Sequence, residues 1–426
     1  MERGDNDMYL MSSVRFHHQG LNLAELRQAL EAACIQMQHE HPVISHTTDW
    51  DETGFPWIQH RGFKDKSEIE AWAAGIIKVE ASGRQASDIR DENEKHRVTD
   101  NEGSARAFTA HLAAPVNSLT DSLGSEPVQF LFHANHIHFD GMGFRQFVGD
   151  LLRVLAKVIS HETPASPTYL TPSLPPLVLD CLGPNQQTSG MTFERNRATY
   201  VKTLMKAARN WGLNAKFPPH GGNTKTIMHR FSADQSKAII ANVKSHLGPD
   251  FTITHLGQAA VVATVLKLNP PGPDVPESQA HVAFSSFNGR RYLDHQYSTG
   301  KKPFYPVCIS TTPILFEDIK SYDFLKADRS ETNALLARAS SVAKSSYDFW
   351  IKQPCQLPLS MSISNLIAYF MVCNKLSHDD LTVPVFASDG IVEKCIPREI
   401  CGANSPEPIL TVEDIHFSLN QHLPYL

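Results

Sequence analysis

The sequence predicts an α/β protein of two lobes, each built from a mixed sheet flanked by helices. Apolar residues follow the strand period of two in some segments and the helix period of 3.6 in others, and both kinds of segment occur along the whole chain. A stretch rich in Pro, Gly and Asn divides the 426 residues into halves of similar size. We therefore expect an N-terminal lobe over residues 1–213, a crossover linker over 214–225 and a C-terminal lobe over 226–426.

The first half opens with a strand and a helix. Residues 8–16 have the pattern of a strand, and residues 23–37 carry apolar side chains at helical spacing with Asn22 as the N-cap. Residues 127–133 form a short apolar run typical of a buried strand. The helical period returns at Gly141 for about five turns.

Prolines mark the end of this region. Six of them fall between residues 163 and 184 and predict an extended connector, and a helix is expected after it over 193–211.

The second half shows the same mixture of elements. Residues 226–231 alternate like a strand, and Ser232 with Gln235 forms a capping box for a helix over 233–247. An apolar helix follows over 254–268. Further strands are expected at 282–287, 307–311, 383–386 and 409–417, and further helices at 331–350 and 362–375.

The composition is that of a folded protein and excludes several classes of function. Lys and Arg total 39 against 45 for Asp and Glu, and no stretch carries the basic patch that phosphate backbones require. Nucleic acid is therefore not an expected partner. The first thirteen residues lack the apolar core of a secretory signal, and no apolar run approaches the roughly 20 residues that span a bilayer. We expect a soluble protein that does not contact membranes.

The cysteines predict reduced thiols. There are seven, an odd number, and they are scattered without any CxxC spacing. This pattern argues against both a disulfide framework and a cysteine zinc site, and it favours a cytoplasmic location.

One stretch of the first half carries a candidate site. Residues 133–141 read HANHIHFDG, so that His136 leaves a buried strand, Asp140 follows four residues later and Gly141 opens a helix. An imidazole can act as a general base near neutral pH. Asp140 can hold the loop through a cation elsewhere in the fold, and Gly141 lets a substrate carbonyl approach the backbone at a helix N-terminus.

Two other interpretations of this stretch compete with a catalytic base. His136 and His138 could begin a metal site, but no further Cys, Asp or Glu stands at ligand spacing, and we expect no metal. Gly141 and Gly143 imitate a dinucleotide fingerprint, but Gln146 occupies the position of its third glycine.

The order of short motifs resembles that of a known superfamily. The apolar strand, the residues NHIHFDG and the apolar helix resemble the HHxxxDG signature of the chloramphenicol acetyltransferase-like superfamily, which includes nonribosomal-peptide condensation domains and fungal trichothecene acetyltransferases. Residues 41–44 (HPVI) resemble its HPxL-like turn. Residues 287–290 (FNGR) resemble the GR segment of condensation domains, and residues 388–392 (SDGIV) before Ile396 and Pro397 resemble the SxGixxxyxP segment of trichothecene-type enzymes.

The resemblance covers nearly the whole chain, with two departures. Asn135 stands where condensation domains carry their first histidine, a position that varies among acyltransferases of the superfamily. No DFGWG occurs near the C-terminus, which argues against a plant-type BAHD acyltransferase.

The resemblance implies a fold and a set of roles. The two lobes would be of the condensation type and meet at a channel where His136 lies as general base. Asp140 would be a structural carboxylate paired with Arg290 of the second lobe. Lys301 and Lys302 are the candidates for binding the phosphates of the donor. The candidates for lining the channel are Asn135, His138, Ser310, Thr312 and Ser388.

The expected function is acyl transfer from a thioester, acyl-CoA or a carrier-protein thioester, to a hydroxyl or amine of a small secondary metabolite. The backbone N–H of Gly141 would stabilise the oxyanion. We expect a monomer with no tightly bound cofactor and acyl-CoA as co-substrate. Two alternatives stay open: a His136-catalysed cyclisation, elimination or isomerisation without an acyl donor, and a non-catalytic binding protein of the same shape.

Overall fold

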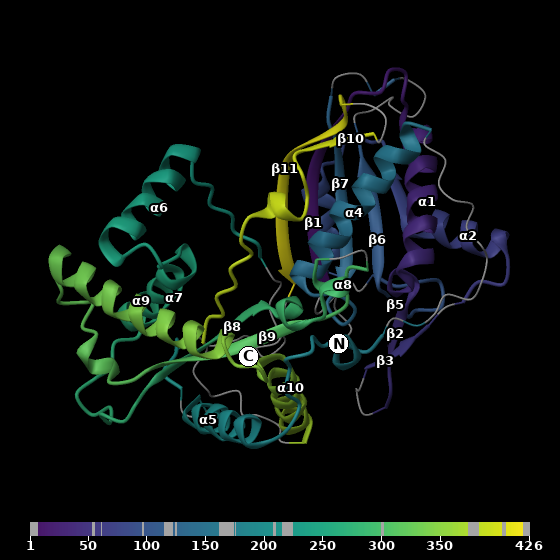
Figure 1. Ribbon diagram of the computed structural model, residues 1–426. Coiled ribbons are helices and arrows are strands. Elements are labelled where there is room, and N and C mark those ends of the chain that lie inside the picture. Colours follow the sequence, from purple (N-terminus) through teal and green to yellow (C-terminus); the bar gives the residue numbers. More distant parts are fainter. Residues whose placement is uncertain are drawn as a thin grey trace.

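A six-stranded sheet is the centre of the first lobe (Figure 1). The computed structural model describes residues 7–52, 56–60, 62–95, 98–114, 122–123, 126–161, 174, 176–207, 210–214, 225–299, 302–373, 383–402 and 406–420. In the sheet the strands lie in the order β10 (Glu399–Cys401), β11 (Pro408–Asn420), β1 (Asp7–Phe16), β7 (Val128–Asn135), β6 (Phe108–Ala113) and β4 (Ile77–Glu80). Neighbours are antiparallel except β4 and β6, which are parallel.

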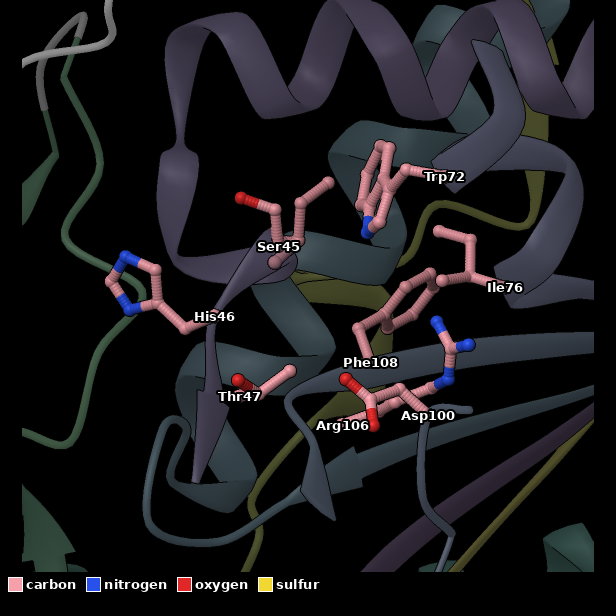
Figure 2. A pocket seen from close by; sticks show the side chains of 9 residues that line it. Ser45, His46, Thr47, Trp72, Ile76, Asp100, Arg106 and Phe108 are labelled. Atoms are coloured by element: carbon pink, nitrogen blue, oxygen red, sulfur yellow. The ribbon is translucent and has the colours of Figure 1, made fainter. Parts of the chain in front are cut away.

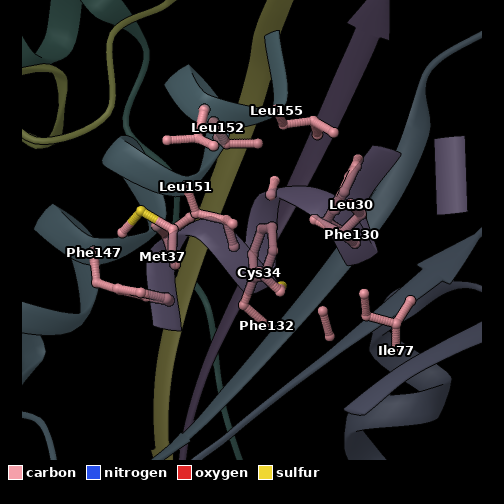
Figure 3. Close-up of a cluster of buried hydrophobic side chains, with 14 of the residues drawn as sticks. Leu30, Cys34, Met37, Ile77, Phe130, Phe132, Phe147, Leu151, Leu152 and Leu155 are labelled. Atoms are coloured by element: carbon pink, nitrogen blue, oxygen red, sulfur yellow. The ribbon is translucent and has the colours of Figure 1, made fainter. Parts of the chain in front are cut away.

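Two helices cover one face of this sheet, and a third covers the other. The helices α1 (Leu23–Glu40) and α4 (Gly141–Ile159) pack together over one face, where Leu30 and Met37 of α1 meet Phe132 of β7 and Phe147 and Leu151 of α4 (Figure 3). On the other face, α3 (Ala86–Asn93) contacts β1, β6 and β7. Helix α2 (Lys66–Ile76) packs against α1. Burial on both faces explains why β7 reads as a continuous apolar run.

A small second sheet lies beside this core. It contains β3 (Pro56–Gln59), β2 (Thr47–Trp50) and β5 (Ala105–Arg106), with β2 in the middle. The 3-10 turn η1 (Pro42–Ser45) joins α1 to β2. This sheet places the residues of β2 next to the turn after β7.

The second lobe is built around the antiparallel pair β8 (His281–Asn288) and β9 (Ile309–Phe316). Helices α7 (Ile253–Leu268) and α9 (Arg329–Ile351) pack on each other, and α9 also contacts β9. The helices α5 (Met191–Ala207) and α10 (Gln356–Cys373) contact each other and β9. Figure 1 shows α6 (Ala233–Leu247), α7 and α9 well away from the six-stranded sheet. Short segments complete the described elements: α8 (His295–Ser298), η2 (Val178–Cys181), η3 (Gly289–Tyr292), η4 (Ile319–Ser321) and η5 (Val392–Lys394).

Two elements, β11 and α5, pack in the other lobe from the one in which the sequence placed them. Strand β11, expected in the C-terminal lobe, pairs with β1 along its length, because β1 otherwise leaves an open edge in the first sheet. Helix α5, expected in the N-terminal lobe, packs on α10, β8 and β9. Most of the predicted linker, residues 215–224, lies outside the described residues, so the boundary there stays a prediction.

Several local predictions are confirmed, and the predictions of two strands are wrong. Asn22 caps α1 and Ser232 with Gln235 caps α6, each in a capping box. Residues 226–231 and 383–386 form no strand. Alternation alone does not make a strand, because its backbone groups also need a neighbouring strand to bond with. Strand β9 begins later and runs further than expected, α5 ends earlier than expected, and α10 begins earlier.

No helix in the described part of the chain is both long and apolar enough to cross a membrane.

Candidate active site

Asn135 closes the turn that carries His136. It is the last residue of β7, and its backbone carbonyl accepts hydrogen bonds from the N–H of His138 at 3.0 Å and of Phe139 at 3.3 Å. Its side-chain Oδ1 accepts from the N–H of Ile137 at 2.9 Å. An asparagine favours this kind of local turn, in which the side chain bonds the backbone two residues on. This explains what Asn135 does at the position where condensation domains carry a histidine.

His136 stands at the tip of this turn. It is partly exposed, whereas the strand before it is almost wholly buried. Within the residues that the structure describes, its side chain makes no hydrogen bond or ion pair. Among the described residues, nothing therefore occupies its two ring nitrogens, and we expect them to bond a substrate.

Asp140 is turned into the protein as the N-cap of α4. Its Oδ1 accepts a hydrogen bond from the N–H of Gly143 at 2.7 Å, and its Oδ2 accepts one from the N–H of Cys308 at 2.7 Å. Nη1 of Arg290 donates to both oxygens, at 3.1 and 3.0 Å. The carboxylate is thus occupied by scaffold contacts, as expected for a structural rather than a chemical role.

Arg290 joins the second lobe to this loop. It lies in η3, directly after β8, and is 1% exposed. Besides Asp140 it donates to the backbone carbonyls of Phe304 (2.5 Å), Tyr305 (3.0 Å) and Pro306 (2.8 Å). Such full pairing is what makes a buried charge tolerable, and removal of one partner is costly.

The glycines after Asp140 serve close packing. A Cβ at Gly143 would lie 2.0 Å from the carbonyl oxygen of Tyr305, so this position admits no larger residue at the present lobe spacing. A Cβ at Gly141 would meet Arg145 and Phe417 at 3.2 Å. The side chains of Arg145 and Phe417 therefore occupy the space that a Cβ at Gly141 would enter, and the approach of a substrate carbonyl to the N–H of Gly141 stays a prediction.

Three histidine rings, those of His46, His60 and His138, lie together behind the turn. Nε2 of His138 is 2.7 Å from Oγ1 of Thr48, and Nε2 of His46 is 2.9 Å from Nδ1 of His60. Burial, together with the smaller effect of a neighbouring imidazole, lowers the pKa of His138 to about 3 and that of His46 to about 4. No group of three potential metal ligands is present among the described residues.

A buried polar cluster contacts Asn135, the residue that precedes the turn. Oδ1 of Asp7 lies 2.8 Å from Nε2 of His133, at ion-pair distance but without hydrogen-bond geometry, and accepts a bond from Nδ2 of Asn135 at 3.3 Å. Asp7 and His133 are each almost fully buried. The sequence offers no signal for this contact, because the two residues meet only through the pairing of β1 with β7.

A small pocket near β2 is separate from His136 (Figure 2). In Figure 2 the apolar side chains Trp72, Ile76 and Phe108 gather on one side of β2, and His46 points to the other. The residues that line this pocket are Ile44, Ser45, His46, Thr47, Trp72, Ile76, Asp100, Arg106 and Phe108. Because His136 is not among them, we do not assign this pocket to the substrate.

Most of the expected channel-lining residues are inside the protein. Asn135, His138, Ser310 and Thr312 are at most 2% exposed. Ser310 bonds Oγ of Ser360 at 2.9 Å, within the second lobe. A residue that borders a solvent channel must expose surface, so these four do not line one in this structure.

The remaining predicted residues are at the surface. Ser388 is exposed and its Oγ accepts a hydrogen bond from Oγ1 of Thr254 at 2.8 Å. Lys301 lies outside the described residues. Lys302 is exposed, and its role toward donor phosphates stays a prediction.

Sequence comparison places the chain among fungal acetyltransferases. The profile of the family described as "15-O-acetyltransferase Tri3" matches residues 1–368. The trichothecene O-acetyltransferase TRI3 of Trichoderma arundinaceum is 33% identical over 446 residues, which cover 100% of this chain and 83% of that protein. The trichothecene 15-O-acetyltransferase TRI3 of Fusarium sporotrichioides is 30% identical over 431 residues, which cover 99% of this chain and 82% of that protein.

Structural comparison agrees with this. The solved structure of the Fusarium sporotrichioides enzyme superposes with a TM-score of 0.85 at 29% identity, over 100% of this chain and 83% of that one. A starter condensation domain of rhizomide synthetase, solved with C8-CoA, superposes with a TM-score of 0.57 at 12% identity, over 99% of this chain and 80% of that one. The second likeness shows the two-lobed condensation fold alone.

Proposed function

The chain belongs to the 15-O-acetyltransferase Tri3 family, and from this premise we propose that it transfers an acetyl group from acetyl-CoA to a trichothecene hydroxyl, with His136 as the general base. Membership of the family makes the protein an O-acyltransferase that acts on a secondary metabolite. The donor, the acceptor class and the residue roles are the proposed parts. The reactions without a donor and the non-catalytic binding protein have no such support.

In the proposed mechanism, His136 takes the proton of the acceptor hydroxyl while the oxygen attacks the thioester carbonyl. A tetrahedral intermediate forms, the C–S bond then breaks, and the protonated imidazole gives its proton to the departing thiolate. A new C–O bond replaces the C–S bond, and the histidine ends as it began. A positioned base of this kind contributes about 10²- to 10⁴-fold to a rate.

The observation that carries the proposal is the contrast between His136 and Asp140. His136 is partly exposed and uncommitted within the described residues, at the tip of a turn that is held from both sides. Asp140 is buried and fully engaged by Arg290, Cys308 and Gly143. One residue is free to react, and the other fixes the loop.

The start of α4 supports a role in stabilising the oxyanion. The N-terminus of a helix carries partial positive charge from its unpaired N–H groups. An unpaired carboxylate at the N-cap would repel a developing oxyanion at this helix end. The positive charge of Arg290 balances the negative charge of the Asp140 carboxylate. We propose that the N–H of Gly141, the first of the helix, faces the developing oxyanion.

The relatives support the choice of substrates. Both TRI3 proteins are named for transfer to trichothecenes, and one specifically for the 15-O position. A condensation domain of the same fold has been solved with an acyl-CoA, which supports CoA over a carrier protein as donor. We take the working unit to be one chain, because His136, Asp140 and Arg290 all come from it.

The test is an acetyl-transfer assay with purified protein. Acetyl-CoA and a trichothecene with a free 15-hydroxyl are supplied, release of CoA thiol is followed, and the product is identified by mass spectrometry. We expect thiol release only with both substrates, and a product heavier by one acetyl group. Conversion of the acceptor without acetyl-CoA would overturn the proposal in favour of a donor-independent reaction.

A further inference from the structure

His138 lies two residues after His136 but faces the interior. It is 2% exposed, and its Nε2 is hydrogen-bonded at 2.7 Å to Oγ1 of Thr48, which is itself fully buried. Its Nδ1 is buried without a hydrogen-bond partner. The bond to Thr48 is therefore the one hydrogen bond that holds this ring within the described structure.

Thr48 is a fixed partner for this bond. It lies on β2, the middle strand of the small sheet, where it pairs with Ile58 of β3 on one side and with Ala105 of β5 on the other. The carbonyl of His46, two residues earlier, accepts from the N–H of Ala107, whose own carbonyl accepts from the N–H of Asn135. The strand is thus tied on both edges and linked to the end of β7.

His138 acts here as a neutral group. Burial, together with the neighbouring His46, keeps it uncharged. With a pKa of about 3 and only 2% of its surface exposed, the ring is too weak and too buried to act as a second base, so its contribution must come through position.

We propose that Thr48 and His138 form a positioning pair that fixes the turn at residues 136–138 and thereby orients the His136 imidazole. Asn135 holds the first part of the turn through its bond to Ile137, and His138 holds the last part. His136 lies between these two anchors. The inference rests on the proposed role of His136 as base, and displacement of a reacting group by about 1 Å can cost 100-fold in rate.

The test replaces the threonine and leaves His136 in place. Thr48→Val removes the hydroxyl at nearly constant shape, and Thr48→Ser keeps it. Thr47→Val is the matched control, because Thr47 directly precedes Thr48 on the same strand and lines the separate pocket of Figure 2. We expect Thr48→Val to lower kcat about 10- to 100-fold with the Michaelis constants of both substrates within about twofold, and Thr48→Ser and Thr47→Val to stay near wild type.

A double variant separates positioning from a general structural effect. If Thr48 acts through His136, then Thr48→Val combined with His136→Ala has the same residual rate as His136→Ala alone, because residues that act as a unit are not additive. A further loss in the double variant, or wild-type kcat in Thr48→Val, would overturn the positioning pair. If His136→Ala itself keeps full activity, the proposed base fails instead, so the two failures are distinguishable.

Discussion

Nη1 of Arg290 lies 3.1 Å from one carboxylate oxygen of Asp140 and 3.0 Å from the other, so two residues 150 positions apart form a buried ion pair between the lobes. Each side chain is 2% exposed. The same arginine also bonds three backbone carbonyls, those of Phe304, Tyr305 and Pro306. The pair therefore connects the start of α4 to the segment before β9.

Loss of this pair is expected to lower stability as well as activity. Asp140→Asn keeps the shape of the side chain but leaves the Arg290 charge buried without its counter-ion, at a cost of about 3–5 kcal/mol. Urea unfolding monitored by circular dichroism measures this. The exposed Asp250→Asn is the control, and equal free energies of unfolding for Asp140→Asn and wild type would contradict the structural role.

His136→Ala is expected to lose activity without losing stability. The side chain is partly exposed and makes no hydrogen bond to the described residues, so its removal leaves no buried group unpaired. Turnover should fall about 10²- to 10⁴-fold. The exposed His246→Ala, made for comparison, should match wild type in both acetyl transfer and thermal unfolding. Substantial turnover by His136→Ala would remove the residue from its proposed role.

The buried imidazoles predict that stability falls in mild acid. The pKa values of His138 (about 3) and His46 (about 4) lie below the ordinary value of 6.5, so the folded state keeps these rings neutral while the unfolded chain protonates them. Their stabilising effect is complete above pH 6.5 and is lost progressively as the pH falls toward 4 and then 3.

The measurement is the free energy of unfolding in urea between pH 7 and about pH 4.5, a range in which the unfolded chain takes up protons on both rings while the folded state keeps them largely neutral. We expect a shallower decline in His46→Gln and in His138→Gln than in wild type, because each lacks one of these titrating groups. His246→Gln serves as the control. If the free energy of unfolding declines as steeply with falling pH in both His46→Gln and His138→Gln as in wild type, these two rings are not the cause of the acid sensitivity.

Gly143→Ala is expected to separate the lobes at the ion pair. In an exposed helix, replacement of Gly by Ala stabilises by about 1 kcal/mol. Here the new Cβ would lie 2.0 Å from the carbonyl oxygen of Tyr305 and 2.4 Å from Nη2 of Arg290. Gly143→Ala is therefore expected to destabilise the protein. Gly272→Ala, whose Cβ would meet nothing within 4 Å, is the control. A thermal midpoint equal to wild type in Gly143→Ala would show that the lobes adjust freely at this contact.

The sequence alone determined the features that depend on neighbours along the chain. The caps at Asn22 and at Ser232 with Gln235 were predictable, because a helix cap bonds backbone groups only three residues away. The strand, turn and helix around His136 were predictable for the same reason. The pairing of Asp140 with Arg290, in contrast, was expected only from the resemblance to a superfamily.

Only the tertiary structure decided which distant segments meet. The contact of Thr48 with His138 joins β2 to the turn after β7, and that of Asp7 with His133 joins β1 to β7. No pattern in the sequence marks either one. Strand β11 completes the first sheet from the end of the chain, whereas residues 226–231 alternate like a strand but form none. Strand pairing depends on a partner supplied from elsewhere in the fold, so periodicity predicts which segments can form strands, and packing decides which of them do.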